Sequence, residues 1–113
     1  MFEKDKLNLL SALDAAHKIS DYSKDYDSAD NFFEHQRDFD AAMMNFIIIG
    51  EMIARLSEEF IDKYNDVDWH KIRGFRNIVA HNYFGIDAEE VWDIIISHLP
   101  LLVNDLNRII AEL

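Results

Sequence analysis

The sequence predicts an all-α protein. Three Gly and one Pro among 113 residues leave few positions that favour a break in a helix. Half of the residues are hydrophobic and 29% are charged, which is typical of a globular chain. Apolar residues also recur at intervals of three and four, as in amphipathic helices. We therefore expect one domain, residues 1–113, built as an antiparallel bundle of four to five helices.

The first predicted helix runs from about Lys4 to Ser23. Its buried face is expected to carry residues at helical spacing: Leu7, Leu10, Leu13 or Asp14, and Ala16 or His17 to Ile19. The stretch from residue 23 to residue 31 is rich in Asp and Ser and predicts the first connection. Asp30 or Asn31 is a candidate cap for the next helix, with Glu34 placed to complete a capping box.

A long second helix is predicted from about Asn31 to Tyr64. Its apolar stripe consists of Phe32, Phe39, Met43, Phe46, Ile49, Ile53, Leu56 and Phe60. At a rise of 1.5 Å per residue this helix would be about 50 Å long, more than one small domain needs. Part of it is therefore expected to pack against a second copy of the chain, because a monomer would expose a large apolar patch.

A third helix, from about Trp69 to Tyr83, contains an unusual charge pattern. Residues 65–68 are expected to end the second helix and to cap the third. Between residues 69 and 86 the chain has no Asp or Glu, although its formal net charge is -11. This acid-free window contains the cationic or titratable residues His70, Lys71, Arg73, Arg76 and His81. The sequence therefore predicts one cationic patch on an acidic protein.

The last two predicted helices follow a turn at Gly85. Asp87 is the expected cap of a fourth helix, Ala88 to Ser97. Pro100 does not fit a helix interior, so we expect a kink or a restart near residue 98. Proline is favoured in a first turn, which places it at the start of a fifth helix ending near residue 111. Trp69, Trp92 and the Phe-rich stripe are expected in the core.

Arg76 and His81 are suited to phosphate chemistry. The guanidinium binds phosphate oxygens through a rigid fork of donors, and the imidazole exchanges protons near pH 7. The pair could equally be a surface cation and a partner for a helix C-terminus. On a straight helix they lie about 140° apart, which keeps them from converging on one phosphate. Either the helix ends near Ala80, or Arg76 reaches around it, or a dimer assembles the site from two chains.

Residues 76–83 match the R-N-x-x-x-H-x-Y signature of the HepT-like toxins, a branch of the HEPN superfamily. Residues 46–57 resemble the I-G-E segment of that family with its following L-S, and residues 69–74 resemble its W-x-x-I-x-G lead-in. Residues 91–92 and 99–102 resemble its closing segment, so the resemblance covers roughly residues 40–113. It implies a homodimer with the site at the interface. A composite site, combined with a helix that ends near Ala80, is therefore the favoured arrangement.

The resemblance implies metal-independent RNA cleavage by a toxin. His81 would remove the proton from a ribose 2′-hydroxyl, which attacks the adjacent phosphorus and leaves a 2′,3′-cyclic phosphate. Arg76 would neutralise the charge that develops on the phosphorane. Asn77 could orient the phosphate or the imidazole. Glu51 lies in an apolar helix segment, where a carboxylate needs a partner, and it is expected either to pair with Arg76 or Arg73 or to be exposed to solvent.

Tyr83 matches the tyrosine to which a minimal nucleotidyltransferase antitoxin attaches AMP in this family. An adenylate beside the cleft would fill it with the charge and bulk of a product mimic. Tyr83 could instead anchor the helix end through its ring. The main alternative for the whole chain is a noncatalytic helical module that partners a nucleotidyltransferase.

Composition disfavours several other functions. The 22 acidic residues, against 11 Lys plus Arg, would repel a phosphate backbone over most of the surface, so RNA must meet a local patch and no DNA partner is expected. The absence of Cys fits a reducing compartment. The N-terminus has no apolar signal core, which predicts a cytoplasmic protein with no membrane contact. One Asp14-x-x-His17 pair without a second copy is weak support for a metal, so no metal or cofactor is expected.

Overall fold

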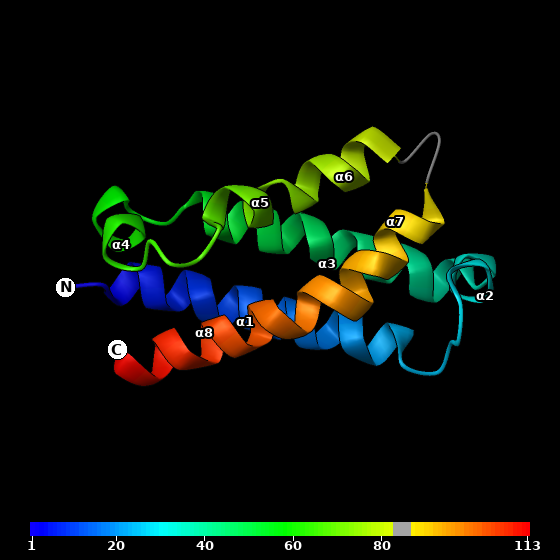
Figure 1. Ribbon diagram of the computed structural model, residues 1–113, viewed down its shortest axis with the longest axis horizontal. Helices are drawn as coiled ribbons and strands as arrows, with labels where there is room; N and C mark the ends of the chain where they lie inside the picture. The colour runs from blue at the N-terminus through cyan, green and yellow to red at the C-terminus, as the bar shows by residue number, and fades with distance from the viewer. Residues whose placement is uncertain (83–86) are drawn as a thin grey trace.

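The computed structural model describes residues 1–82 and 87–113, without the side chains of residues 78 and 80–82. All regular secondary structure in these residues is helical, in four arms (Figure 1). The first arm is α1, the second runs from α2 to α4, the third is α5 with α6, and the fourth is α7 continued into α8. The bounds are α1 Glu3–Ser23, α2 Ala29–Glu34, α3 Gln36–Ala54, α4 Glu58–Lys63, α5 Trp69–Arg73, α6 Phe75–Asn82, α7 Ala88–Asp93, a π-helical turn Ile94–His98 and α8 Leu99–Glu112. The predicted all-α bundle is confirmed.

Helices α1 and α3 form the centre of the bundle. They lie side by side, α8 packs along α1, and α5 and α6 pack on α3. Both chain termini lie at the end of the bundle where α4 is found (Figure 1). This arrangement leaves α6 on the outside of the bundle, supported from below by α3.

Helix α1 begins and ends close to the predicted positions, but its predicted buried face is only partly correct: Ala16 and Ile19 are buried as predicted, whereas Leu7 and Leu10 are not. The buried side chains facing the core are Leu9, Ala12, Ala15, Ala16 and Ile19. Leu7 and Leu10 are instead 64% and 41% exposed. The small alanine side chains allow α3 to pack closely against this face, so packing with α3 decides the orientation of α1 rather than the size of its leucines.

The predicted single helix from Asn31 to Tyr64 is wrong, because the chain breaks twice within it. The backbone leaves helical geometry at His35, with φ -95° and ψ 77°, and again at Ser57, where ψ is 153°. Ser28, rather than Asp30 or Asn31, caps α2 by accepting the Asn31 N–H at 3.1 Å. The longest remaining piece, α3, has 19 residues and is therefore about 28 Å long.

The apolar stripe predicted for that long helix is nevertheless buried inside one chain. Its eight residues are all at most 7% exposed. The stripe therefore packs within the protomer and cannot serve as the reason for a dimer. The exposed Leu7 and Leu10, and Met44 at 58% exposure, are among the apolar residues that remain available to a partner.

The break before α4 is held by a contact with the N-terminal helix. Asp5 is only 5% exposed, and its carboxylate accepts the N–H and the hydroxyl of Ser57, each at 2.8 Å. The Ser57 hydroxyl in turn accepts the N–H of Phe60 at 3.2 Å and caps α4. The chain therefore turns at Ser57 because a carboxylate 52 residues away fixes it.

The third and fourth arms follow their predicted caps. Asp68 accepts the Lys71 N–H and begins α5, and Asp87 accepts the Glu90 N–H and begins α7. The predicted helix 69–83 is interrupted at Gly74, whose N–H bonds back to the carbonyls of His70 and Lys71. Pro100 stands in the first turn of α8, as predicted, and the π-helical turn before it provides the restart.

One helix, Ala88–Glu112, is long and apolar enough by length and composition to cross a membrane. A core helix of a bundle has the same composition. Leu102, Leu106 and Ile109 of this helix are at most 3% exposed, and α8 packs against α1. These contacts place one face of the helix in the core, while 33% of its apolar window is buried.

Candidate active site

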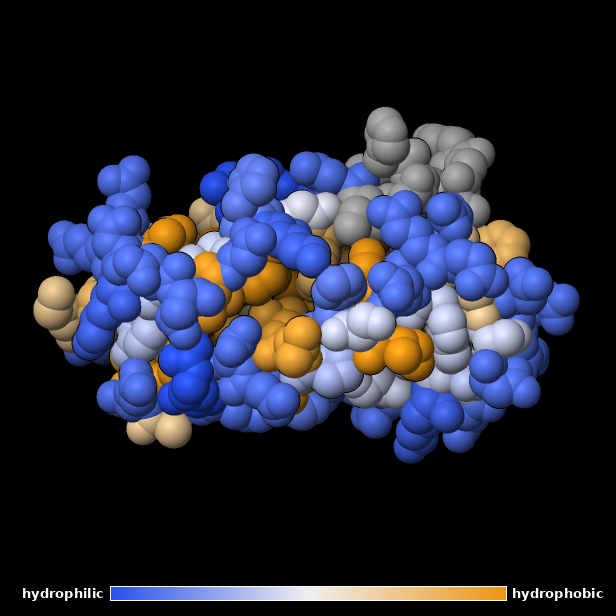
Figure 2. All heavy atoms as spheres, viewed as in Figure 1, coloured by the Kyte–Doolittle hydropathy of each residue, from blue (hydrophilic) through white to orange (hydrophobic). Residues whose placement is uncertain are grey.

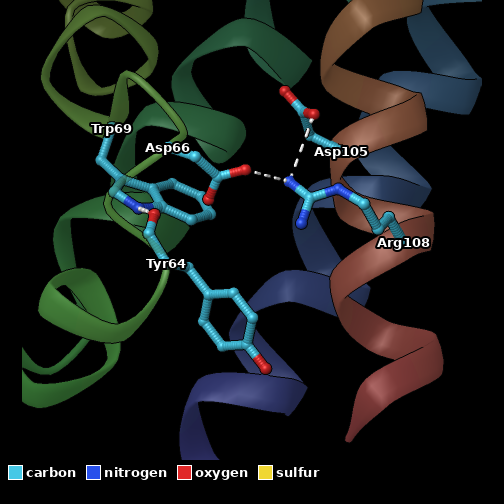
Figure 3. Close-up of polar contacts among 5 residues, drawn as sticks. All are labelled: Tyr64, Asp66, Trp69, Asp105 and Arg108. Atoms are coloured by element: carbon cyan, nitrogen blue, oxygen red, sulfur yellow. Dashed lines mark hydrogen bonds and ion pairs between the residues drawn. The ribbon is translucent and has the colours of Figure 1, made fainter.

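Helix α6, which carries Arg76, follows the segment from α4 through α5. The part of that segment before α5 is held in place by two sets of contacts. The indole Nε1 of the buried Trp69 donates to the carbonyl of Tyr64 at 2.9 Å. Arg108 of α8 pairs with Asp66 at 2.8 Å and with Asp105 at 3.5 Å (Figure 3). These contacts tie this segment to α8 and fix where α5 begins. Trp69 is thereby confirmed as a core residue.

Arg76 is held by Glu51. The Arg76 Nη1 lies 2.9 Å from the Glu51 Oε1, and the two side chains are 35% and 45% exposed. Of the two partners expected for Glu51, the structure therefore selects Arg76. Because an arginine has five N–H donors in a planar fork, this one hydrogen bond fixes the orientation of the guanidinium without using its other donors.

The other described candidates, Arg73 and Asn77, lie at the surface. Arg73 ends α5 and Asn77 follows Arg76 in α6, and both are exposed. Lys71 and His70 are also exposed on α5. The acid-free window therefore presents several cationic groups to solvent around the partly buried Arg76.

Two predicted residues fall wholly or partly outside the described part of the chain. Helix α6 extends through Asn82, so the expected helix end near Ala80 is wrong. His81 therefore lies on the same helix as Arg76, about 140° around its axis, while its side chain is outside the described residues. Tyr83 lies outside them entirely. A single straight helix does not direct Arg76 and His81 at one phosphate. Two arrangements therefore remain: the Arg76 side chain reaches around the helix, or a dimer assembles the site from two chains.

A separate groove lies between α5 and α8. Figure 2 shows apolar side chains at the bottom of a hollow on the face turned to the viewer. Its lining consists of Val67, Asp68, Lys71, Ile72, Phe75, His98, Leu101, Leu102 and Asp105. At the rim, the Lys71 Nζ lies 3.5 Å from the His98 Nδ1. Neither Arg76 nor Glu51 lines this groove, so it is distinct from the candidate active site.

The weak metal-binding pattern on α1 has another explanation. Asp14 pairs with Lys18 at 3.2 Å, and both side chains are more than half exposed. Within the described residues, no three His, Asp or Glu side chains are placed to share a metal ion.

The family is established by comparison with known proteins. The model of the HepT-like ribonuclease family matches residues 12–109, which includes both Glu51 and Arg76. The chain belongs to the HepT-like ribonuclease family. The match extends beyond the roughly 40–113 expected from sequence motifs, since it also includes the second half of α1 and all of α2.

Several similar proteins are named putative RNases. A Methanocaldococcus jannaschii protein named "Putative RNase MJ0127" is 31% identical over 105 residues, which are 93% of this chain and 86% of that protein. "Gamma-glutamylcyclotransferase and putative RNase MJ0434", from the same organism, is 33% identical over 96% of this chain, which spans 48% of that longer protein. A Caldanaerobacter subterraneus protein, "Putative RNase TTE0752", is 35% identical over 58% of each chain. No solved structure matches the chain significantly.

Gly50 was missed as a candidate from the sequence. A Cβ placed on it would lie 2.9 Å from the Cβ of Arg76, so this glycine is in direct contact with the residue at the centre of the site. The available signal was an isolated glycine inside an apolar helical segment, which often marks a close approach of two elements.

Proposed function

We propose that this chain is a metal-independent endoribonuclease and the toxin of a toxin–antitoxin pair. The observation that carries the proposal is the partly exposed guanidinium of Arg76, oriented by Glu51 at 2.9 Å on the helix that also contains His81. Membership of the HepT-like ribonuclease family supports RNA as the substrate. The acidic remainder of the surface, with a formal net charge of -11, favours contact with RNA at this patch alone.

In the proposed reaction, His81 takes the proton of a ribose 2′-hydroxyl as a general base. The 2′-oxygen attacks the adjacent phosphorus, the bond from phosphorus to the 5′-oxygen breaks, and the leaving 5′-oxygen takes a proton from water, while His81 later releases its proton to solvent. The products are a 2′,3′-cyclic phosphate and a 5′-hydroxyl. Arg76 donates to the phosphorane oxygens, where charge accumulates, while Asn77 and Arg73 contact neighbouring phosphate oxygens from the surface.

Growth arrest tests the assignment of Arg76 and His81. Expression of the parent chain alone is expected to arrest growth, whereas Arg76→Ala and His81→Ala are expected to relieve the arrest with unchanged helical circular dichroism. Arg37→Ala is the matched control, because Arg37 is 96% exposed on α3 and is far from the motif in sequence. If both motif variants arrest growth like the parent, these catalytic roles are wrong.

We also propose that the active form is a homodimer. Met44 lies seven residues before Glu51, almost two turns of α3, so the two share one face of the helix. A groove between α1 and α3 is lined by Leu7, Leu10, Ser11, Asp14, Ala15, Lys18, Asn45 and Ile48. A partner that covers the exposed Leu7, Leu10 and Met44 would pack against α1 and against the face of α3 that carries Glu51, which supports a site shared between two chains.

Light scattering tests the dimer. The parent is expected at twice 13.3 kDa, and Met44→Glu is expected at the monomer mass. Leu101→Glu is the control, because Leu101 is 62% exposed, compared with 58% for Met44, and it stands on α8 instead of on the face of α3 that carries Glu51. A parent that is monomeric at micromolar concentration would contradict the shared site.

The proposed antitoxin is a minimal nucleotidyltransferase that attaches AMP to Tyr83. Incubation with a nucleotidyltransferase encoded beside this chain, ATP and Mg²⁺ is expected to add one or more adenylate masses and to abolish RNA cleavage. Tyr83→Phe should block the modification while retaining the fold, because it removes one oxygen atom. An adenylate mapped to Tyr22, Tyr26 or Tyr64, or none at all, would contradict this assignment.

The alternative is a noncatalytic module that binds a nucleotidyltransferase. The excess of acidic residues, 22 against 11 Lys plus Arg, favours a protein partner over RNA. The two functions differ in one property: only the toxin cleaves RNA in the absence of any other protein.

A further inference from the structure

Helix α3 meets the start of α6 at Gly50. A Cβ built on Gly50 would lie 2.9 Å from the Cβ of Arg76 and 3.1 Å from both the backbone N of Arg76 and the carbonyl oxygen of Arg73. Real Cβ atoms essentially never approach another heavy atom closer than 3.0 Å. Two of the three atoms belong to the backbone, so they cannot move aside as the end of a flexible side chain could. The observed approach of the two helices therefore requires glycine at this position.

This contact concerns Arg76 in particular. Its Cβ is pressed against Gly50, while its Nη1 is bonded to the carboxylate of Glu51, the next residue of α3. Two consecutive residues of one helix therefore fix the two ends of one side chain. Glycine is a poor helix former, and yet it stands in the interior of α3.

We infer that Gly50 is a positioning residue that sets the distance of Arg76 from α3, and thereby the orientation of its guanidinium toward the RNA phosphate. This inference rests on the proposed ribonuclease function. A methyl group at position 50 would move the start of α6 outward by a few tenths of an ångström or more. Arg76 would then leave the position in which Glu51 orients it, although no polar group has been removed.

Kinetics of RNA cleavage by the full chain provide the first test. Because small displacements of a catalytic group lower the turnover rate strongly, Gly50→Ala is expected to reduce kcat about tenfold and to leave KM within about twofold. Gly74→Ala is the matched control, since its Cβ would lie 3.1 Å from the carbonyl of Lys71 and has no contact with Arg76. Equal kcat values for Gly50→Ala and the parent would overturn the inference, as would an equal loss in Gly74→Ala.

The side-chain resonance of the Arg76 Nε–Hε group gives a readout that does not depend on cleavage. It is assigned by its loss in Arg76→Lys. In the parent, Glu51→Gln is expected to shift this resonance, because the negative charge that pairs with the Arg76 Nη1 is removed. In Gly50→Ala the resonance should already be displaced, and adding Glu51→Gln should change it little. If Gly50→Ala leaves the resonance where it is in the parent, the inference is overturned.

A size exchange covers the case in which Gly50→Ala does not fold. The variant Gly50→Ala with Arg76→Gly moves the Cβ from one side of the contact to the other. If the contact is as described, Gly50→Ala lowers the melting temperature less in the Arg76→Gly background than in the parent, because the 2.9 Å contact between the two Cβ atoms is removed while the two backbone contacts at 3.1 Å remain. An equal decrease in both backgrounds would contradict it.

A parent that does not cleave RNA, together with the expected shift of the Arg76 resonance, would refute the ribonuclease proposal and leave the placement of Arg76 by Gly50 intact.

Discussion

Two arginines of this protein form a short ion pair with a carboxylate from another part of the chain. Arg108 lies 2.8 Å from Asp66, and Arg76 lies 2.9 Å from Glu51. All four side chains are between 35% and 61% exposed. Geometry and exposure are therefore similar in the two pairs, and what differs is the part of the fold that each pair serves.

The pair of Arg108 connects α8 with the segment between α4 and α5, at the end of the bundle that contains α4. There the same guanidinium also approaches Asp105, and the nearby Trp69 is bonded to the carbonyl of Tyr64 (Figure 3). The pair of Arg76 lies on α6, which rests on α3 through the buried Phe75 and Val79 and the contact at Gly50. The comparison indicates that the first pair fixes the scaffold, whereas the second pair orients a functional group.

The largest effect on stability is expected at the end of the bundle that contains α4. Phe60 is fully buried and packs against the rings of Phe2, Tyr64 and Trp69. Because truncation leaves a cavity, Phe60→Ala should lower the free energy of unfolding by about 3–5 kcal/mol, measured by urea denaturation. A loss below about 1 kcal/mol would show that this end is not the stable part of the fold.

The next largest effect is expected at Asp5. Its carboxylate accepts two hydrogen bonds from Ser57, and its removal leaves a backbone N–H with no acceptor in a half-buried place. Asp5→Ala should therefore cost about 1–3 kcal/mol in urea denaturation. Asp14→Ala is the control, because Asp14 is 68% exposed in its pair with Lys18 and should cost less than about 1 kcal/mol. Similar losses in both variants would remove the special role of the Asp5–Ser57 contact.

The two ion pairs themselves should contribute little to stability. Arg108→Ala and Glu51→Gln are each expected to lower the free energy of unfolding by about 0.2–1 kcal/mol, because both pairs are open to solvent. RNA cleavage should distinguish them: Glu51→Gln should lower kcat by about tenfold, since an amide holds the guanidinium of Arg76 less firmly than a carboxylate, while Arg108→Ala should not. An equal effect on kcat would contradict the division between scaffold and site.

The smallest expected effect is a change in the pH dependence of stability, caused by Tyr64 at the end of α4. Burial raises the pKa of Tyr64, and the neighbouring Glu112 carboxylate raises it further. A phenol whose pKa is raised on folding contributes stability that is complete below its ordinary pKa of about 10 and is lost as the pH rises through the folded value. Tyr64→Phe should therefore flatten the decline in stability above pH ~10. Equally steep declines in the variant and the parent would refute the assignment.

Local patterns predicted much of this fold. Asp87, and the segment 65–68 that contains Asp68, were identified as caps because a cap depends on the next three residues. The eight-residue apolar stripe was identified because helical periodicity survives the breaks at His35 and Ser57. The pairing of Glu51 followed from the cost of an unpaired carboxylate in an apolar segment.

Contacts between distant residues could not be predicted in the same way. The turn at Ser57 depends on Asp5, 52 residues earlier, and no local pattern indicates this partner. The buried face of α1 was partly mistaken because alanines that pack closely against α3 displaced the larger Leu7 and Leu10 to the surface. Gly50 was recognised only when the structure placed it against Arg76.

Cleavage of a short RNA by the purified chain tests the central claim most directly. The parent, Arg76→Ala and Arg108→Ala are compared in the presence of EDTA, and the product ends are identified by mass. The parent should leave 2′,3′-cyclic phosphate ends, and Arg76→Ala should be slower by about 10²- to 10³-fold. Arg108→Ala should remain within about twofold of the parent. Equal rates for the parent and Arg76→Ala, or no cleavage by the parent, would contradict the account.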